Sequence, residues 1–387
     1  MESTVKKNIL VLIDWYVPGY KAGGPIRSCS NLVLQLKKYF NFRIITRDTD
    51  LNAEQPYPNI KSDEWSHIHD DVPIHYLSKT NVNFKKIKSL VLSQEFDMVY
   101  LNSFFSFYFT ILPLFILKGL KRDKNIILAT RGMLSPQALK IKPLKKKLFI
   151  AFAKISGLYS GITFHASTEF EKTDVIRIMG KKADVIIGPN LPKPVSPERL
   201  KRKKIPRELK LVYLSRVHPI KNLDKALDYL YKIDKLYKVE FDIYGPIENN
   251  NYWARCKQQI SMLPSNIKCS YKNEVHHELT AEVYKKYHFS ILPSESENYG
   301  HSIVESFVAS CPVIISDATP WRQLKNSLAG FDIALNNPEG FVNALEEVCE
   351  MPQTEYDKWL EGTFDYAKRI IDDKEKIEQN KNLFETA

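Results

Sequence analysis

Short apolar runs alternate with longer amphipathic segments along the chain, and the alternation occurs twice. In the first half, runs of four to seven residues have the length and composition of buried strands. They cover residues 8–14, 42–46, 74–77, 97–101, 125–130, 162–166 and 184–188. Segments 26–40, 84–94 and 105–120 between them have the apolar spacing of helices. Strands alternating with such helices form parallel sheets through right-handed crossovers.

The second half repeats this organisation after a charged segment with four prolines, residues 190–210. Its predicted strands are residues 210–215, 239–245, 267–271, 288–293, 312–316 and 331–335, and the chain from about Thr354 has a helical pattern. A length of 387 residues also suits two domains. We therefore predict an α/β protein with two doubly wound, Rossmann-like domains that face a central cleft. The predicted N-terminal domain is 1–190, the linker 191–208 and the C-terminal domain 209–365.

The charge of the chain is concentrated in its first half. The net charge is +11, but residues 1–200 hold 30 basic and 17 acidic residues, a net charge of +13. The remaining residues have a net charge of −2. Within 101–150 there are ten basic residues and one acid, Asp123. This asymmetry suggests that the first half meets an anionic partner.

Cysteine usage and hydropathy indicate a cytoplasmic protein. The five cysteines are scattered and form no CxxC, which is typical of reduced thiols. The apolar run Ile9–Ile13 is interrupted by Asp14 and is too short for the core of a signal peptide. The stretch Phe104–Leu117 contains Pro113 and falls short of the roughly 20 residues that span a bilayer. We expect it to form a core or membrane-apposed helix.

A glycine-rich loop follows the first predicted strand. Gly23 and Gly24 precede a helix that begins near Ile26. Glycines at this place let backbone amides approach a phosphate, and the helix N-terminus adds positive potential. Lys21 and Arg27 would supplement such an anion site. The alternative is an ordinary flexible strand-to-helix loop.

Two cations lie at the carboxyl end of the first strand of the second domain. Arg216 follows the strand directly, and Lys221 lies at the start of the next helix. Cations at a helix N-terminus oppose the helix dipole, so this placement makes sense if an anion lies between them. The alternative is a solvated basic surface, but ligands of such sheets bind at strand ends, which favours a phosphate site.

The loop after the strand 288–293 carries two carboxylates in the pattern E-x7-E. Glu297 lies in the loop and Glu305 in the following helix. Ionised carboxylates only accept hydrogen bonds and therefore suit sugar or ribose hydroxyls. The amides of Tyr299, Gly300 and His301 between them begin the helix and suit a diphosphate. Together these groups are what a nucleotide-sugar requires, and the alternative is two surface glutamates.

At this point the chain resembles retaining GT-B glycosyltransferases of glycosyltransferase family 4. The resemblance in organisation covers nearly the whole chain, and its specific part runs from about Leu211 to Pro320. It is carried by the motifs S-R-x4-K at 215–221, D-I-Y-G-P at 242–246, E-x7-E at 297–305 and A-S-C-P-V-I at 309–314. The resemblance implies a donor-binding C-terminal domain and an acceptor-binding N-terminal domain.

The same resemblance implies roles for individual residues. Glu297 would contact the transferred sugar, Glu305 would hold the ribose, and Arg216 and Lys221 would neutralise the leaving diphosphate. The remaining donor contacts would be the phosphate-covering Gly23 and Gly24 and, near the base, Gly245 and Pro246. The C-terminal helix, about 366–387, is similar to the one that packs back on the N-terminal domain in this fold.

The chain departs from the family where many members have a histidine that faces the donor sugar. The matching stretches offer Arg131 and Asn102 instead. Arg131 would hold a phosphate or an acidic acceptor, or it is a structural arginine at a helix start. His165, after the next strand, either reaches the cleft or is a packed core histidine.

Residues 139–159 combine lysines with apolar residues at helical spacing. Leu144, Leu148, Phe152 and Ile155 share one face, part of which we expect to be core. Basic amphipathic helices can lie on anionic lipid, and the alternative is a solvated face. The lysines of this membrane or acceptor patch are Lys140, Lys142, Lys145, Lys146 and Lys147. No nucleic-acid recognition module is visible, so nucleic acid is not an expected partner.

The function that follows is transfer of a sugar from a nucleotide diphosphate sugar to a saccharide acceptor, with retention of configuration. We expect a lipid-linked, diphosphate-bearing acceptor used in surface polysaccharide such as lipopolysaccharide or capsule. No DxD-like motif follows a strand of the first domain, so we expect neither a metal nor another cofactor. The alternatives are a GT-B nucleotide-sugar epimerase or phosphorylase, and a non-catalytic sugar-nucleotide-binding protein.

Overall fold

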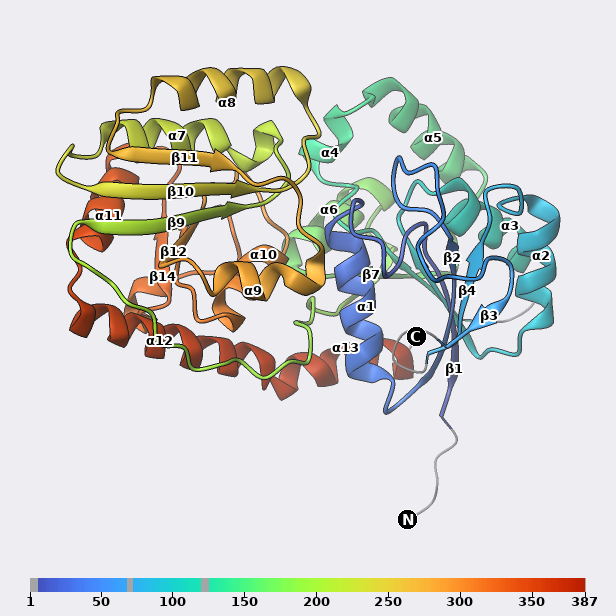
Figure 1. Ribbon diagram of the computed structural model, residues 1–387. Coiled ribbons are helices and arrows are strands. Elements are labelled where there is room, and N and C mark those ends of the chain that lie inside the picture. Colours follow the sequence, from blue (N-terminus) through green and yellow to red (C-terminus); the bar gives the residue numbers. More distant parts are fainter. Residues whose placement is uncertain (1–5, 68–71, 120–124, 387) are drawn as a thin grey trace, which may run out of the picture. The chain divides into compact units, whose positions relative to one another are not determined.

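A computed structural model describes residues 6–67, 72–119 and 125–386. The chain forms two compact units, of which the first extends to Pro194 and includes the chain from Asp373 on. The second comprises Val195–Asp372. Each unit contains a largely parallel β-sheet covered by helices (Figure 1). All thirteen strands predicted from the sequence are present, which confirms the predicted α/β class.

The first unit contains an eight-stranded sheet of order β3-β4-β2-β1-β5-β6-β7-β8. Its strands are β1 (Asn8–Leu12), β2 (Asn41–Arg47), β3 (Trp65–Ser66), β4 (Ile74–Leu77), β5 (Met98–Asn102), β6 (Asn125–Ala129), β7 (Thr163–Ala166) and β8 (Asp184–Ile187). The chain proceeds from β1 toward one edge and then from β5 toward the other, so the direction of winding switches between β1 and β5. The sequence did not predict the two-residue β3, which pairs antiparallel with β4 at the edge.

Helices cover both faces of this sheet. They are α1 (Gly24–Leu36), α2 (Phe84–Ser93), α3 (Leu112–Gly119), α4 (Pro136–Lys140), α5 (Pro143–Ile155), α6 (Glu169–Met179) and α13 (Lys374–Thr386). One core joins the sheet to α1 and α13, and the other joins it to α2, α3, α5 and α6. Five residues of α3 are buried, so this part of the apolar stretch packs mainly in the core, while Phe107 and Phe115 are exposed. Among the described residues, no helix is both long enough and apolar enough to cross a membrane.

The second unit contains a six-stranded parallel sheet of order β11-β10-β9-β12-β13-β14. Its strands are β9 (Glu208–Leu214), β10 (Lys238–Tyr244), β11 (Ile267–Tyr271), β12 (Phe289–Leu292), β13 (Val313–Ser316) and β14 (Gly330–Ile333). Here the winding switches between β9 and β12. In doubly wound sheets, ligands bind beyond the carboxyl ends of the strands at such a switch point.

Two layers of helices enclose the second sheet (Figure 1). Its helices are α7 (Leu223–Lys232), α8 (Asn250–Met262), α9 (Thr280–Tyr284), α10 (His301–Val308), α11 (Pro338–Glu350) and α12 (Gln353–Ile371). Helices α8 and α11 pack beside α7, and α9 and α12 pack beside α10. In the core, Trp359 of α12 stacks on Phe331 of β14 with ring centroids 4.9 Å apart. This packed core fixes the strand ends that carry the candidate site.

The C-terminal segment belongs to both units. Helix α13 packs on the first sheet, where the Phe384 ring contacts the rings of Phe42 and Tyr100. Residues 366–371, which the sequence prediction included in this returning helix, belong to α12 instead. Their apolar members Ala367 and Ile370 are buried in the core of the second unit. The helical pattern of the sequence continues from α12 into α13. It therefore does not reveal that the chain passes from the second unit to the first near Asp373.

Candidate functional site

Lys221 and Glu297 form a short ion pair at the switch point of the second sheet. Lys221 ends the 3-10 helix Pro219–Lys221 that follows β9, and Glu297 lies in the loop after β12. Lys221 Nζ lies 2.6 Å from Glu297 Oε1, and each side chain is only 11% exposed. Because water is largely excluded, the pair interacts more strongly than an exposed one, and removal of one partner leaves the other charge uncompensated. The structure thus brings together the cation and the carboxylate that the sequence singled out.

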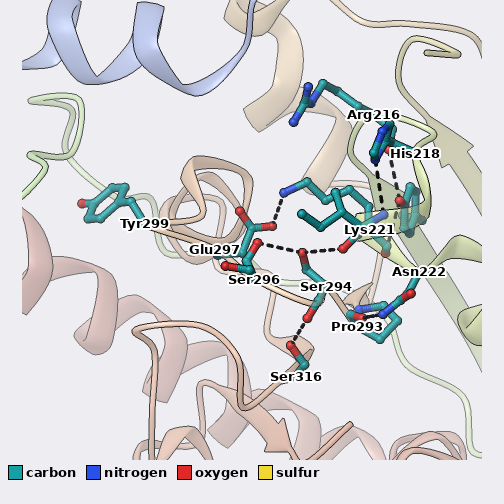
Figure 2. A network of polar contacts seen from close by, with 12 residues as sticks. Arg216, His218, Lys221, Asn222, Pro293, Ser294, Ser296, Glu297, Tyr299 and Ser316 are labelled. Atoms are coloured by element: carbon teal, nitrogen blue, oxygen red, sulfur yellow. Dashed lines mark hydrogen bonds and ion pairs between the residues drawn. The ribbon is translucent and has the colours of Figure 1, made fainter. Parts of the chain in front are cut away.

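Hydrogen bonds from Asn222, Ser294 and Glu295 hold the loops that carry this pair, and Figure 2 shows the Asn222 and Ser294 side chains. Asn222 Nδ2 donates to the carbonyl oxygen of Pro293 over 2.7 Å. The Ser294 hydroxyl and the Glu295 amide both donate to the Ile220 carbonyl, at 3.1 and 2.8 Å. Sequence reasoning missed Asn222 and Ser294. Asn222 has a positive φ of 53°, which asparagine tolerates better than most residues, so its place at the helix start was an available signal.

Arg216 is bound by Glu248 rather than by the pair. Its Nη1 donates to Glu248 Oε2 at 2.9 Å and to Oε1 at 3.0 Å. In Figure 2 the guanidinium lies above the Lys221 ammonium group, and no dashed line joins it to Glu297. Glu248 follows β10, whose carboxyl end lies beside that of β9. Sequence reasoning did not include Glu248, and no motif spacing connects it with Arg216.

Gly245 and Pro246 hold the end of β10 against the end of β9. The Pro246 carbonyl accepts a 2.9 Å hydrogen bond from the Val217 amide. Gly245 has φ of 138°, and a Cβ there would lie 1.9 Å from the carbonyl oxygen of Ser215. A side chain cannot fit at that distance, so glycine is required for the close approach of the two strand ends. Gly245 therefore has a structural role in the packing of β9 against β10, which is independent of any contact with a ligand.

The N-terminus of α10 follows the Glu297 loop. Gly300 precedes the helix in the left-handed conformation, with φ of 75°, and no side chain caps the helix start. The buried Tyr299 packs edge-on against Trp321, and its carbonyl accepts a hydrogen bond from Trp321 Nε1. His301 begins the helix, and Glu305 lies half-buried one turn further along. The predicted donor residues on this segment are therefore held on one rigid element.

In the first unit, the glycine loop leads into α1 as expected. Gly23 precedes the helix with φ of 75°, and Gly24 is exposed at its first turn. The amides of Tyr20 and Lys21 already donate to Asp50 Oδ2, at 2.9 and 3.2 Å. Asp50 thus fixes the first part of the loop. Sequence reasoning missed this residue, which lies after β2.

Arg131, Asn102 and His165 belong to one hydrogen-bonded network at the strand ends of the first sheet. Arg131 Nη2 donates to Asn102 Oδ1 at 2.9 Å and to the Tyr100 hydroxyl at 2.8 Å. The Tyr100 hydroxyl lies 2.7 Å from His165 Nδ1, and His165 Nε2 lies 2.7 Å from the Gly188 carbonyl. A carbonyl can only accept, so Nε2 carries the proton and Nδ1 accepts from Tyr100. The direction of the whole chain of hydrogen bonds follows from this tautomer.

This network corrects one sequence expectation. His165 and Asn102 are buried, so neither is placed to contact a sugar directly. Of the three residues considered, Arg131 is the one with a partly exposed side chain. His165 is the packed core histidine, and burial, reinforced by the charge of Arg131, lowers its pKa to about 4. Asn102 and His165 therefore position Arg131.

The His165 environment predicts a pH dependence of folding stability. The folded pKa of about 4 lies below the unfolded value of about 6.5, so the unfolded chain binds more protons between these values. Stability present above pH 6.5 is then lost as the pH falls toward 4, by about 2–3 kcal/mol from this group. We expect His165→Asn to be less stable at pH 7.5 but to lose less on acidification. Urea unfolding between pH 7.5 and 4.5 measures both effects, and parallel profiles of the two proteins would contradict this account.

The lysine patch lies on α4 and α5. The face of α5 that packs against the core is not the one that we expected from the sequence. Lys140, Lys142, Lys145 and Lys147 are exposed, and Lys146 is half-buried with its Nζ donating to the Ala138 carbonyl. We expected part of the apolar face of this helix to be core, but all four of its large residues are exposed; they are Leu144, Leu148, Phe152 and Ile155. Ala153 is buried in their place, and Phe149 and Ile150 pack on the core. Helical spacing shows which residues share a face but not whether that face is covered.

Within residues 6–67, 72–119 and 125–386, no three His, Cys, Asp or Glu side chains are grouped so that they could hold a metal ion. The five cysteines are free thiols, and four of them are buried.

Comparison with known protein families finds a match in the second unit. Residues 196–363 match the family model for glycosyl transferases of group 1. A search of curated protein sequences found no match. The family match favours a glycosyltransferase over an epimerase, a phosphorylase or a non-catalytic binding protein.

Solved structures share the fold over nearly the whole chain. HepE of Anabaena in complex with UDP-glucose has a TM-score of 0.70 at 13% identity, with 98% of this chain and 100% of that chain covered. Sucrose-phosphate synthase of Thermosynechococcus elongatus has a TM-score of 0.69 at 13% identity and covers 98% and 99%. A glycosyltransferase of Rickettsia africae has a TM-score of 0.65 at 14% identity and covers 98% of both chains. The two Rossmann-like units thus have the GT-B fold, and the match of residues 196–363 to the group 1 model indicates that the protein is a transferase.

Proposed function

We propose that the protein transfers a glycosyl group from a nucleotide diphosphate sugar to an acceptor hydroxyl, with retention of configuration. The observation that carries the proposal is the Lys221–Glu297 pair at the switch point of a group 1 glycosyl transferase domain. Its cation suits a departing phosphate, and its carboxylate suits sugar hydroxyls. The sequence resemblance to family 4 implies the same assignment.

The positive groups of the second unit would stabilise the leaving diphosphate. Lys221 is held in place before any ligand binds, which is electrostatic preorganisation. The amides at the start of α10 add the positive end of a helix dipole. When the donor binds, Arg216 would leave Glu248 and contact the diphosphate instead. The Arg216 and Glu248 side chains are both partly exposed, so breaking their ion pair costs little free energy. We propose that this charge compensation operates without a metal or other cofactor.

The two glutamates would recognise hydroxyl groups on either side of the diphosphate. Glu297 Oε1 is bound by Lys221, and its second oxygen would accept from the transferred sugar. Glu305 would accept from the ribose hydroxyls. No side chain in this arrangement is assigned as a nucleophile, so we propose a front-face reaction in which the donor phosphate oxygen assists deprotonation of the acceptor.

The first unit would bind the acceptor. Gly23 and Gly24 would lie over the phosphates, and Arg131 would hold an anionic group of the acceptor. We propose a lipid-linked, diphosphate-bearing saccharide as the acceptor, destined for surface polysaccharide and met at the cytoplasmic face of an anionic membrane. The exposed lysines of α4 and α5 support this choice, because their charge complements phosphate-rich lipid.

A panel of nucleotide-sugars tests the donor proposal by thermal stabilisation. HepE was solved with UDP-glucose, so uridine donors are tried first. A ligand at a hundredfold excess over its dissociation constant adds about 2.7 kcal/mol to native stability. We expect one donor to raise the melting temperature of the wild type and to have less effect on Lys221→Met. No shift with any nucleotide-sugar would contradict the proposal.

Gly24→Ala tests whether the donor phosphates approach the glycine loop. A Cβ at Gly24 would meet no atom within 4 Å, and alanine favours a helix over glycine by about 1 kcal/mol. We therefore expect an unchanged or slightly higher melting temperature but a rise of about tenfold in the donor KM, because the methyl group keeps the phosphates away. Steady-state kinetics and a melting curve measure the two effects. An unchanged KM would remove the loop from the donor site.

A further inference from the structure

The outward face of α5 is a row of large apolar side chains. Leu144, Leu148 and Ile155 are 75%, 73% and 89% exposed. At 100° per residue, the three lie within about 40° of one another around the helix axis. Phe152, also exposed, lies about 40° further round. A contiguous apolar row of this size in contact with water is uncommon and indicates an interaction surface.

The opposite face of the same helix is anchored in the first unit. Ala153 is buried, and Phe149 and Ile150 pack against the core. The Phe149 ring also contacts the ring of Phe105 at 5.7 Å. The direction in which α5 faces is therefore set by packing, so the exposed row is not a rotated core face.

Exposed lysines flank the apolar row on both sides. Lys145 lies on one side of it, and Lys147 and Lys154 lie on the other. The sequence has no acidic residue between Asp123 and Glu169. Long lysine side chains beside an apolar row can place their ammonium groups at the level of lipid phosphates while the row enters the acyl region.

We propose that α5 inserts its apolar row into the surface of an anionic bilayer, with its axis in the membrane plane. This inference rests on the membrane contact in the proposed function and adds that the contact is hydrophobic as well as electrostatic. A second copy of this chain fits the surface poorly, because its lysines would meet the same lysines. Anionic lipid neutralises them on both flanks at once.

Membrane binding through inserted apolar side chains responds differently to salt from membrane binding through surface charge. Salt screens the attraction of lysines to lipid, whereas burial of apolar side chains in acyl chains persists. Binding by α5 is therefore expected to remain measurable in about 0.5 M salt, at which the Debye length is about 4 Å. Binding by charge alone disappears under the same conditions.

Flotation with vesicles tests this, using phosphatidylcholine that contains about one third phosphatidylglycerol. The full-length wild type is compared with Leu148→Ser/Ile155→Ser and with Lys145→Gln/Lys147→Gln. The matched control is Leu236→Ser, which removes another exposed leucine, in the turn before β10. Melting curves report whether each variant is folded.

We expect the leucine–isoleucine double variant to lose about tenfold or more in vesicle partitioning at both salt concentrations. The lysine variant should lose binding mainly at low salt, and Leu236→Ser should bind like the wild type. Equal binding by the wild type and the folded apolar variant would overturn insertion, as would dimerisation through this face in place of vesicle binding. Donor turnover by the wild type without vesicles reports the proposed enzymatic function separately, so failure of one is distinguishable from failure of the other.

Discussion

Replacement of Glu297 by glutamine is expected to lower kcat/KM for donor turnover by about a thousandfold, or about 4 kcal/mol. Glutamine has nearly the same shape but carries no charge, so it leaves the poorly exposed Lys221 ammonium without its counter-charge. It also weakens acceptance of a sugar hydroxyl. Steady-state release of nucleotide diphosphate measures the loss.

Glu295→Gln is the matched control for this substitution. Glu295 lies two residues earlier in the same loop with an exposed side chain, and its backbone amide keeps the hydrogen bond to Ile220. We expect its activity to stay within about twofold of the wild type. The double variant Lys221→Met/Glu297→Gln should lose less activity than the two single losses combined, since the residues act as a pair. Equal losses for Glu295→Gln and Glu297→Gln would contradict the assigned role.

Gly245→Ala should destabilise the protein by about 3 kcal/mol or more. The new Cβ would lie 1.9 Å from the Ser215 carbonyl oxygen, so the ends of β9 and β10 must separate. This movement would also displace Arg216, which follows Ser215. The urea midpoint followed by tryptophan fluorescence measures the effect.

Gly161→Ala separates steric overlap from backbone strain. Gly161 also has a positive φ, 69°, but a Cβ there would meet no atom within 4 Å. Strain alone should cost about 1 kcal/mol. Equal destabilisation by the two substitutions would show that the close approach of Gly245 to Ser215 does not matter.

The sequence predicts the parallel strands of this fold because they lie in sheets that helices cover on both faces. Such strands are continuous apolar runs, which are visible without tertiary information. The loops at their carboxyl ends then follow directly, and these loops place Lys221 and Glu297 near each other although 76 residues separate them. The two-residue β3 has no such run and could not be found in this way.

Ion pairs and hydrogen bonds between side chains far apart in the sequence could not be predicted in the same way. Arg216 pairs with Glu248 because β9 and β10 are neighbours, and no motif connects the two residues. Asn102 and His165 lie near the carboxyl ends of β5 and β7, yet their side chains are turned into a buried network with Tyr100. Residue type and position at a strand end therefore do not show whether a side chain reaches the surface.

The most direct test of the central claim is release of nucleotide diphosphate from the donor that binds in the panel, with and without acceptor. The claim is that Lys221 and Glu297 form the donor site of a glycosyltransferase. It predicts slow release without acceptor, faster release with a lipid-linked saccharide, and loss of both in Lys221→Met and Glu297→Gln. Undiminished release by both variants would contradict it.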